Sequence, residues 1–387
     1  MGDIYVNSAW KTIVVGGLNA GGRGYYALDV TDPLNPKMLW EFSDTDLGYT
    51  FGNPVITKKN DGTWVVVFSS GYNNVNPGDG NGYLYVLNAN TGALLSKLGT
   101  NVSGAAVGNT TTPSGLNKIN TYVESDVNNT TKVVYGGDLL GNVWRFDIDS
   151  VVKPYLSAMR LAELKVGTKP QPITSKPALA EVSYNGAKYK VIYVGTGRYL
   201  GMSDLANTDT QTIYALKDSW SETGLGNVRL LTNQANEMVV QTATTATSAT
   251  QGNIVKGTAK PVNWTTHSGW YLDFISSGER VSVNPLLVLN ALYVGTNVPK
   301  NDACTVGGTS WLYKLDIAKG SAIANSPESA IAVSLGNVLI MGMTNVQLTT
   351  GSVATIVTRS DGTLKTVTGA QPTIAGNLRR TSWRTLK

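Results

Sequence analysis

Short runs of apolar residues that end in glycine recur along this chain, and each is followed by a second run that carries an aromatic residue. The apolar runs are TIVVGG, WVVVFSSG, KVVYGG, VIYVGTG and ALYVGT. Short apolar segments bounded by glycine and polar turn residues are typical of buried β-strands. Glycine at the end of such a strand lets the backbone turn sharply or approach a neighbour closely. We therefore predict five β-hairpins, each pairing an apolar strand with an aromatic strand.

The aromatic strands form a repeat of their own. They read YYALDV (25–30), YLYVLNA (83–89), NVWRFDI (142–148), TIYALKD (212–218) and WLYKLDI (311–317). Aligned on the aromatic residue, they define one predicted core position, which holds Tyr26, Tyr85, Trp144, Tyr214 and Tyr313. One strand pair per repeat cannot bury both of its faces, whereas repeats packed side by side around an axis can. The repeat therefore predicts a β-propeller.

We expect an all-β fold, a single β-propeller domain over residues 1–387 with long loop insertions. The five repeats and the further strands after Ile331 predict seven blades, with six as the alternative. A pair of β-sandwiches is the main structural competitor, but a repeated strand–glycine–aromatic-strand unit argues against it. Closure between the first and last strands would remove exposed sheet edges.

Composition supports strands and excludes several classes of function. Glycine is abundant, at 42 of 387 residues, and charged residues make up only 15%. No stretch approaches the roughly 18 apolar residues that a membrane helix needs, so we predict no membrane span. The net charge of +5 is mild and its basic residues are scattered except near the end, which argues against nucleic-acid binding. The first ten residues lack the features of a signal peptide.

Candidate catalytic groups are sparse. The paired carboxylates Asp44 and Asp46, and Asp147 and Asp149, have no accompanying histidine or positioning motif. Hydrolysis by such a pair requires a cleft and one raised pKa, and the alternation is equally typical of strand ends. The chain has one cysteine, Cys304, which we interpret as an inert thiol. The sequence therefore predicts that the protein is not an enzyme.

Two glycine-rich loops imitate binding sites. The segment 16–24 lacks the lysine and the serine or threonine of a phosphate loop and lies between two predicted strands, so we interpret it as a hairpin turn. The segment 73–82 offers several asparagines but only one carboxylate, Asp79, which is weak for calcium. We interpret it as a long exposed turn, with a glycan or partner contact as the alternative.

Several stretches in order along the chain resemble the C-terminal domain of the PilC/PilY family of type IV pilus biogenesis factors and tip adhesins. They are VVGGLNAGGRGYYALDVTDPLNPKMLWEF (14–42), LGYTFGNPVITK (47–58), YGGDLLGNVWRFD (135–147), YVGTGRYLGMSDL (193–205) and RRTSWR (379–384). The resemblance implies a modified seven-bladed propeller at the bacterial cell surface or pilus tip, associated with the outer membrane and reached through the periplasm. It also implies that this chain is the C-terminal fragment of a longer protein.

In that family, the loop before this third stretch often carries alternating oxygen ligands that bind calcium. By resemblance, the ligand positions are Glu124, Asp126, Asn128 and the backbone carbonyl of Thr130. The final acidic ligand position is occupied by Lys132, an ammonium group where calcium needs a carboxylate. We therefore favour a degenerate, metal-free loop in which Lys132 pairs with Asp126 and Glu124, and we expect no cofactor. Calcium binding is the alternative.

The resemblance implies a non-enzymatic module for type IV pilus assembly and tip adhesion. Its partners would be minor pilins or other pilus-tip proteins, and it would support control of pilus extension and retraction. One alternative is a propeller that binds a glycan or a host receptor at the cell surface. The other is a quinoprotein dehydrogenase, because ALDVTDPLNPKMLW (27–40) resembles the docking motif of those propellers. By resemblance to that docking motif, Trp40 would pack between two blades.

Overall fold

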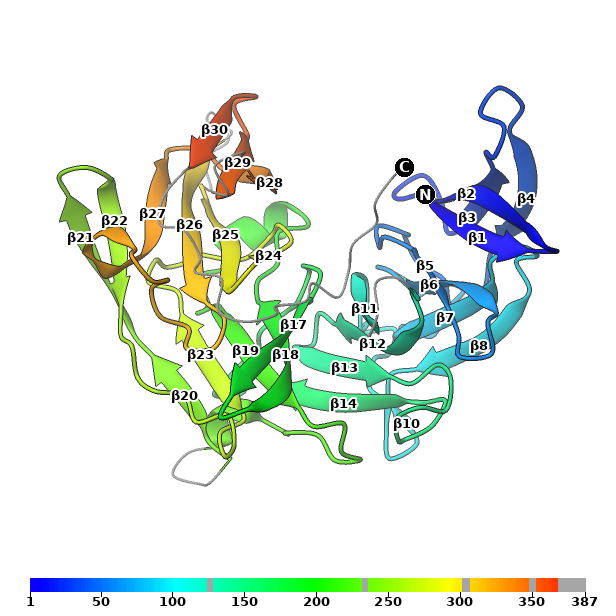
Figure 1. Cartoon of the computed structure of the whole chain (residues 1–387), viewed down its shortest axis with the longest axis horizontal. Coiled ribbons are helices and arrows are strands. Elements are labelled where there is room, and N and C mark those ends of the chain that lie inside the picture. The colour runs from blue at the N-terminus through cyan, green and yellow to red at the C-terminus, as the bar shows by residue number, and fades with distance from the viewer. Residues whose placement is uncertain (124–127, 232–235, 301–306, 348–352, 368–387) are drawn as a thin grey trace. The chain divides into compact units, whose positions relative to one another are not determined.

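The structure of this chain is a computed structural model, and it describes residues 1–123, 128–231, 236–300, 307–347 and 353–367 (Figure 1). Regular structure in this part of the chain is almost entirely β-strand. The short 3₁₀ helices are η1 (Met202–Ala206), η2 (Val228–Leu230) and η3 (Pro327–Ser329). The described chain forms two compact units. Of the described residues, we call those within 1–163 and 220–226 the first unit, and those within 164–219 and 227–367 the second unit.

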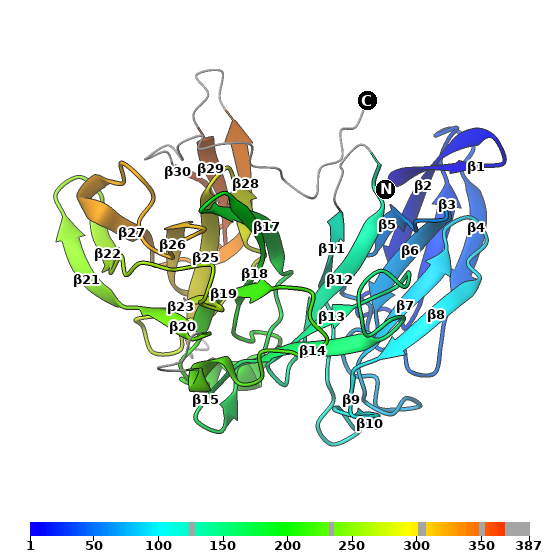
Figure 2. The ribbon, with the colours of Figure 1, turned by 60° about the horizontal axis from the view of Figure 1, so that its bottom comes forward.

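The first unit contains three four-stranded antiparallel sheets, each with its strands in chain order. They are β1 (Gly2–Val6), β2 (Ala9–Gly17), β3 (Tyr25–Asp29) and β4 (Lys37–Phe42); β5 (Val55–Lys58), β6 (Trp64–Ser69), β7 (Tyr83–Asn88) and β8 (Leu94–Gly99); and β11 (Ile119–Val123), β12 (Thr131–Gly137), β13 (Asn142–Phe146) and β14 (Ala158–Glu163). A small hairpin, β9 (Asn101–Val102) with β10 (Ala105–Ala106), follows the second sheet. Apolar side chains join the first sheet to the second and the second to the third. Figure 2 shows the ribbons of these three sheets.

The second unit departs from this regular meander. Its five-stranded sheet runs in the order β17 (Ala178–Tyr184), β18 (Ala187–Gly195), β19 (Thr212–Asp218), β23 (Gly269–Asp273) and β20 (Met238–Gln241), with β20 parallel to β23. A six-stranded sheet has the order β21 (Ala243–Ser248), β22 (Gly252–Gly257), β27 (Ala330–Gly336), β26 (Gly308–Asp316), β25 (Ala291–Pro299) and β24 (Leu286–Val288). The remaining strands are β28 (Ile340–Gln347), β29 (Val353–Arg359) and β30 (Leu364–Val367), which form one sheet, and the hairpin β15 (Lys165–Val166) with β16 (Lys169–Pro170).

All five predicted hairpins are present. The apolar strands are β2, β6, β12, β18 and β25, and each pairs antiparallel with the aromatic strand that follows it. Tyr85, Trp144, Tyr214 and Tyr313 are fully buried, which confirms them as core residues.

Tyr26 was predicted to be a core residue, and this prediction is wrong. It is only partly buried, and its neighbour Tyr25 takes the core position at 2% exposure, stacked on Phe68 with ring centroids 4.0 Å apart. Successive side chains on a strand point to opposite faces. In β3 Tyr25 and Ala27 face the second sheet, where they pack with Tyr85 and Leu87, and Tyr26 stands on the opposite face of the strand.

The polar residue that follows each aromatic strand's leucine or phenylalanine has a structural role. In four repeats its side-chain oxygen accepts backbone N–H groups of the following turn, and these residues are Asp29, Asn88, Asp147 and Asp316. Such turns hold the backbone without help from a second strand. The fifth repeat has Lys217, whose ammonium donates to the Trp264 carbonyl at 2.9 Å. In four of the five repeats this position therefore anchors the turn that leads out of the aromatic strand.

Trp40 joins two sheets, as the docking motif predicted. Its indole N–H donates to the Ala89 carbonyl at 3.0 Å, and its ring packs on Gly92, where a Cβ atom would lie 2.6 Å from the indole. Gly92 also has a φ of 72°, a conformation that favours glycine. In the second unit the Trp270 indole N–H donates to the Ile317 carbonyl at 3.0 Å in the same manner.

Candidate functional site

The family's calcium-loop position lies between β11 and β12 in the first unit. Glu124 and Asp126 lie outside the described residues, so their predicted pairing with Lys132 stays a prediction. Asn128 is exposed and Thr130 is buried. Asn129 has a φ of 48°, so it takes the left-handed conformation that asparagine tolerates.

The neighbouring sheet holds the second half of this loop in place. The Asn129 carbonyl accepts hydrogen bonds from the Lys58 backbone N–H at 3.0 Å and from the Thr57 hydroxyl at 2.8 Å. Thr57 and Thr131 also hydrogen-bond through their hydroxyls at 2.6 Å. These contacts fix the loop against β5, which belongs to the second sheet. A segment more than 70 residues away in sequence therefore determines the backbone position here.

Two lysine side chains lie at this loop, Lys58 from β5 and Lys132 at the last ligand position of the loop itself. The Lys58 ammonium donates to the Asn128 side-chain oxygen at 2.7 Å. Lys132 reaches across to the turn between β5 and β6, where its ammonium lies 3.4 Å from the Asn60 side-chain oxygen. An oxygen that already accepts from an ammonium is a poor ligand for calcium, because the two cations repel each other. Lys58 was missed by sequence reasoning, since no local motif connects it to this loop.

Both predicted carboxylate pairs have structural partners. Asp147 accepts four backbone N–H groups of the turn after β13, and Asp149 lies 3.3 Å from the Lys59 ammonium. Asp44 and Asp46 share the ammonium of Lys97, at 2.8 Å and 2.6 Å. Neither pair is arranged as a free acid facing a free base, which general acid–base catalysis requires.

The structure brings Asp44 and Asp46 together with the glycine-rich loop 73–82, which the sequence left apart. The Asp79 backbone N–H donates to Asp46 at 3.1 Å, and the Tyr83 hydroxyl donates to Asp79 at 2.6 Å. The loop is therefore tied down at Asp79 and is more than an exposed turn. Among the described residues, no group of three or more His, Cys, Asp or Glu side chains is placed to hold a metal ion.

The Lys97 ammonium sets the electrostatics of this cluster. Burial acts to raise the pKa of the Asp44 carboxyl, but hydrogen bonds from Lys97, the Asp46 backbone and Tyr85 outweigh it and leave that pKa below its usual value. The Lys97 ammonium also lies 4.6 Å from the centroid of the Tyr83 ring. A protein cation thus fills the centre of an acidic cluster.

Asp138, from the family-like stretch 135–147, is fully buried. Its carboxylate accepts the Trp144 indole N–H at 2.8 Å, the Asn142 backbone N–H at 2.8 Å and the Leu140 backbone N–H at 3.0 Å. Burial raises the pKa of Asp138 to about 6, although these donated N–H groups act in the opposite direction. Asp138 therefore fixes the hairpin between β12 and β13 and places Trp144 in the core.

In the second unit, a buried guanidinium organises the loop after β18. Arg280 is 3% exposed and donates to the backbone carbonyls of Gly278, Arg198, Asp204 and Asn207 at 2.6–3.0 Å. The Asp204 carboxylate in turn accepts from the Arg198 side chain at 2.7 Å. The family-like stretch 193–205 includes this loop, and Arg280 itself was missed because it lies far along the chain.

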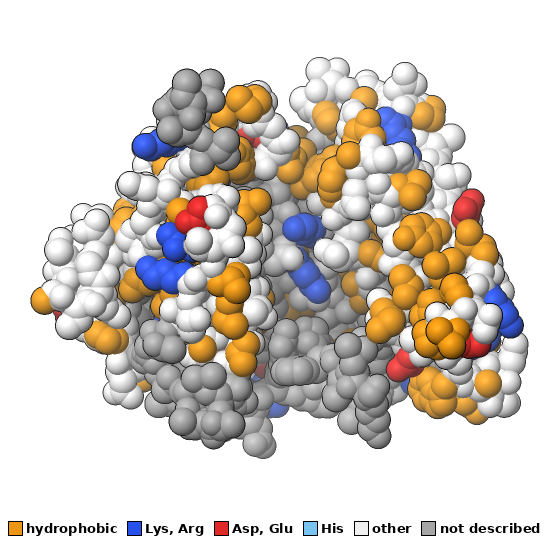
Figure 3. Space-filling view, turned by 90° about the horizontal axis from the view of Figure 1, so that it is seen from above, with side chains coloured by type: hydrophobic (Ala, Val, Ile, Leu, Met, Phe, Trp, Pro, Cys, Tyr) orange, Lys and Arg blue, Asp and Glu red, His pale blue; other side chains and the backbone are white. Residues whose placement is uncertain are grey.

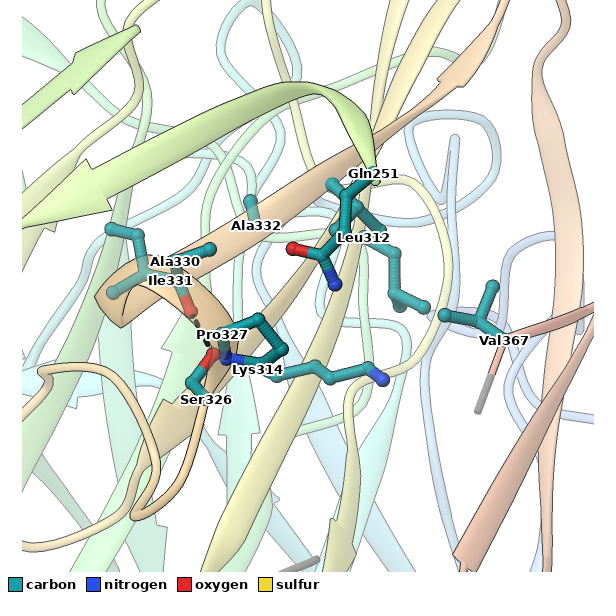
Figure 4. A pocket seen from close by; sticks show the side chains of 10 residues that line it. Gln251, Leu312, Lys314, Ser326, Pro327, Ala330, Ile331, Ala332 and Val367 are labelled. Carbon is teal, nitrogen blue, oxygen red and sulfur yellow. Dashed lines mark hydrogen bonds between the residues drawn. The ribbon is translucent and has the colours of Figure 1, made fainter. Parts of the chain in front are cut away.

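A small pocket in the second unit, of about 20 Å³, lies beside Lys314 (Figure 4). Such a volume holds about one water molecule. Figure 4 shows the Lys314 side chain passing Pro327, with its amine on the side of the pocket where Val367 lies. Burial lowers the pKa of Lys314 to about 8. Its ammonium has the ring of Tyr293 at 5.9 Å but no ion pair among the described residues.

Three comparisons with known proteins agree with this geometry. The family model of the PilY1 beta-propeller domain matches residues 1–250. The type IV pilus biogenesis factor PilY1 homolog of Xylella fastidiosa is 32% identical over 365 residues, which cover 87% of this chain and 24% of the relative. The type IV pilus biogenesis factor PilY1 of Pseudomonas aeruginosa is 30% identical over 354 residues, which cover 81% of this chain and 29% of the relative.

A solved structure shows the same fold. The crystal structure of the Pseudomonas aeruginosa PilY1 C-terminal domain matches with a TM-score of 0.75 at 24% sequence identity, covering 95% of this chain and 82% of that chain. The repeated antiparallel sheets, joined by buried tryptophans, are the blades of a β-propeller. The chain belongs to the PilY1 family.

The predicted family and the predicted propeller fold are therefore confirmed, whereas the number of blades and the single-domain organisation stay predictions. This chain spans about a quarter of the Xylella relative and 29% of the Pseudomonas relative. No helix among the described residues is long and apolar enough to cross a membrane. Cys304 and the stretch 379–384 lie outside the described residues.

Proposed function

We propose that this chain is a non-enzymatic propeller module that supports type IV pilus assembly and adhesion at the pilus tip. Its membership of the PilY1 family carries the proposal, because the relatives named as pilus biogenesis factors match over more than four fifths of the chain. The module would act at the bacterial surface, associated with the outer membrane and reached through the periplasm. Its partners would be minor pilins or other pilus-tip proteins.

The roles of the candidate catalytic groups support the non-enzymatic part of the proposal. Asp44 and Asp46 are held by Lys97, Asp149 is held by Lys59, and Asp147 caps a turn. Each of these carboxylates is occupied by partners that stabilise the fold. Retained pilus assembly after mutation of Asp44 to Asn would agree with a structural role.

Deletion of residues 1–387 from the full-length protein tests the pilus role. We expect fewer surface pili while the minor pilins are still produced, measured by electron microscopy and by the amount of sheared pilin. A pull-down of the isolated module with individual minor pilins, with and without a chelator, tests the partner. Normal piliation after the deletion would contradict the proposal.

We also propose that the loop before β12 does not bind calcium. Lys58 occupies the Asn128 oxygen, and Lys132 replaces the last acidic ligand. A ligand that binds only the native state raises stability by about 2.7 kcal/mol at 100 times its dissociation constant. We expect no calcium-dependent rise in the melting temperature of the wild-type chain.

The matched variants Lys132→Asp and Lys132→Gln make this test sharp. Asp restores the acidic ligand position, so calcium should raise the melting temperature of Lys132→Asp and give binding heat in calorimetry. Gln removes the ammonium without adding a carboxylate, so it should respond weakly or not at all. A calcium-dependent rise of several degrees in the wild type would show that the loop binds the metal despite Lys132.

A further inference from the structure

Three aromatic side chains form a row on the surface of the first unit. Tyr5 and Trp10 face each other across the β1–β2 hairpin with ring centroids 5.3 Å apart, and Trp10 lies 6.2 Å from Trp64 on β6. Tyr5 is 49% exposed and Trp10 is 62% exposed. We call Tyr5, Trp10 and Trp64 the aromatic row. Figure 3 shows hydrophobic side chains gathered at the surface over the part of the molecule that carries the first unit, with both basic and acidic groups beside them.

The hairpin that carries the row is rigid at its turn. Asn7 and Ser8 have φ values of 52° and 62°, the backbone of a two-residue turn with the twist that β-hairpins favour. The turn fixes the register, so Tyr5 and Trp10 stand on the same face. Trp64 packs against the apolar core below and anchors the row at its other end. The row is therefore preorganised, and little side-chain freedom would be lost on binding.

A positive charge lies at one end of the row. The Lys58 ammonium is 5.9 Å from the centroid of the Trp64 ring, and its hydrogen-bond partner is the neutral amide oxygen of Asn128 at 2.7 Å. No carboxylate forms an ion pair with Lys58 among the described residues. Within the described residues its charge is therefore balanced by an amide dipole and an aromatic ring, which leaves it able to attract an anion.

The tilt of the rings decides which ligand chemistry fits. Neighbouring rings are inclined by 55° and 69°, so they present alternating faces and edges instead of one flat platform. A planar base needs parallel ring faces, whereas a puckered sugar ring offers C–H groups that can pack against a face and hydroxyl groups that reach the polar rim. Asn7 and Ser8 are exposed at the turn and can supply hydrogen bonds to such hydroxyl groups.

We propose that the aromatic row and Lys58 form a binding site for an acidic saccharide. The sugar rings pack on Trp10 and Tyr5, and a carboxylate of the saccharide pairs with the Lys58 ammonium. The charge complementarity with Lys58 selects an acidic sugar over a neutral one. This site goes beyond the pilus role. Its test does not depend on pilus assembly, because the assays measure ligand binding by the isolated chain.

Titration calorimetry and ligand-observed NMR with the whole chain test the site. The probes are tetragalacturonate, a uronic acid tetramer, and cellotetraose, a neutral tetramer of glucose. We expect weak binding of the acidic tetramer, with a dissociation constant on the order of 0.1–1 mM, and at least tenfold weaker binding of the neutral one. Raising the salt concentration should weaken only the acidic ligand.

Two variants and one control locate the site. Trp10→Ala should weaken tetragalacturonate binding at least tenfold, and Lys58→Gln should bring its affinity down to that of cellotetraose. Lys58→Arg, which keeps the charge, should retain most of the binding. Tyr155→Ala removes another exposed aromatic residue of the same unit, 53% exposed, and should leave the affinity unchanged.

Several results would overturn the proposal. They are no binding at millimolar concentrations, equal affinity for the two tetramers, or binding that survives Trp10→Ala. Because each substitution removes a surface side chain, an unchanged melting temperature will separate loss of the site from loss of the fold.

Discussion

In each unit one loop lies beside positively charged side chains, but these side chains differ in how deeply they are buried. In the second unit Arg280 is 3% exposed and donates to four backbone carbonyls. In the first unit Lys58 and Lys132 are partly exposed, and each donates to one amide oxygen in the contacts described above. The buried guanidinium holds its loop in place through backbone hydrogen bonds, whereas the two ammonium groups stay partly exposed to water.

The difference follows from desolvation. A buried cation is stable only when every donor has an oxygen partner, so removing it leaves buried carbonyl groups without hydrogen bonds. A partly exposed ammonium keeps its contact with water, and its replacement is compensated by solvent. Five substitutions of cationic residues test this comparison, from the largest expected effect on stability to the smallest.

The largest effect is expected for Arg280→Met. Three carbonyls of the loop and that of Gly278 lose the guanidinium as a donor, and we expect a loss of about 3–5 kcal/mol in the free energy of unfolding, measured by urea denaturation. The control is Lys188→Met, which breaks the exposed pair with Glu181 and should cost less than about 1 kcal/mol. A small effect for Arg280→Met would mean that the loop holds itself without the guanidinium.

Lys97→Met should have an intermediate effect, because the ammonium lies between Asp44 and Asp46. We expect a loss of about 1–3 kcal/mol near pH 7 from two carboxylates left side by side. The pKa of Asp44 is lowered in the folded state, so this contribution is present above the unfolded pKa of about 3.9 and is lost as the pH falls through the folded value. Wild type and variant should therefore converge in acid. Lys97→Arg, which keeps the charge, should lose less.

Lys314→Met should increase stability, by about 1–3 kcal/mol near pH 7. Burial lowers the pKa of Lys314 to about 8 from 10.5, so the unfolded chain binds this proton more tightly. Stability of the wild type should therefore rise with pH between these two values, and the gain from the variant should vanish at the upper one. Melting curves at pH 7 and pH 10.5 measure this. An equal gain at both pH values would show that the effect comes from packing and not from charge.

The smallest effects are expected for Lys58→Gln and Lys132→Gln, each within about 1 kcal/mol of the wild type in the absence of added metal. Both residues are partly exposed, and glutamine still offers an N–H donor to the amide oxygen. Chemical denaturation measures the change. If either variant lost as much stability as Arg280→Met, exposure would not be the property that separates the two loops.

Much of the fold was predictable because its signals are local. The apolar strands that end in glycine, and the aromatic strands after them, pair as predicted. Trp40 packs between two sheets, as the docking motif indicated, and meets Gly92 and Ala89 there. The exception is Tyr26, which keeps the strand position of the other repeat aromatics but stands on the face of β3 turned away from the second sheet. Which face of a strand a neighbouring sheet covers is not encoded in the repeat.

The contacts at the candidate site were harder to predict from the sequence than the fold. The departure at Lys132 is visible in the loop's own pattern, but the partners of the loop come from β5 and from the turn after it. Lys97 and Arg280 show no motif, since each acts on residues far away in the chain. The aromatic row likewise joins Tyr5 and Trp10 to Trp64 across two sheets.

By itself, the sequence determined the class of fold, the family and the turns that end each aromatic strand. These features depend on strand periodicity, on glycine and on short-range capping by Asp29, Asn88, Asp147 and Asp316. Only the tertiary structure decided which cation meets which oxygen and which aromatic residues stay in water. Those outcomes depend on the packing of sheets that lie far apart in the chain, where side-chain contacts form that no local pattern encodes.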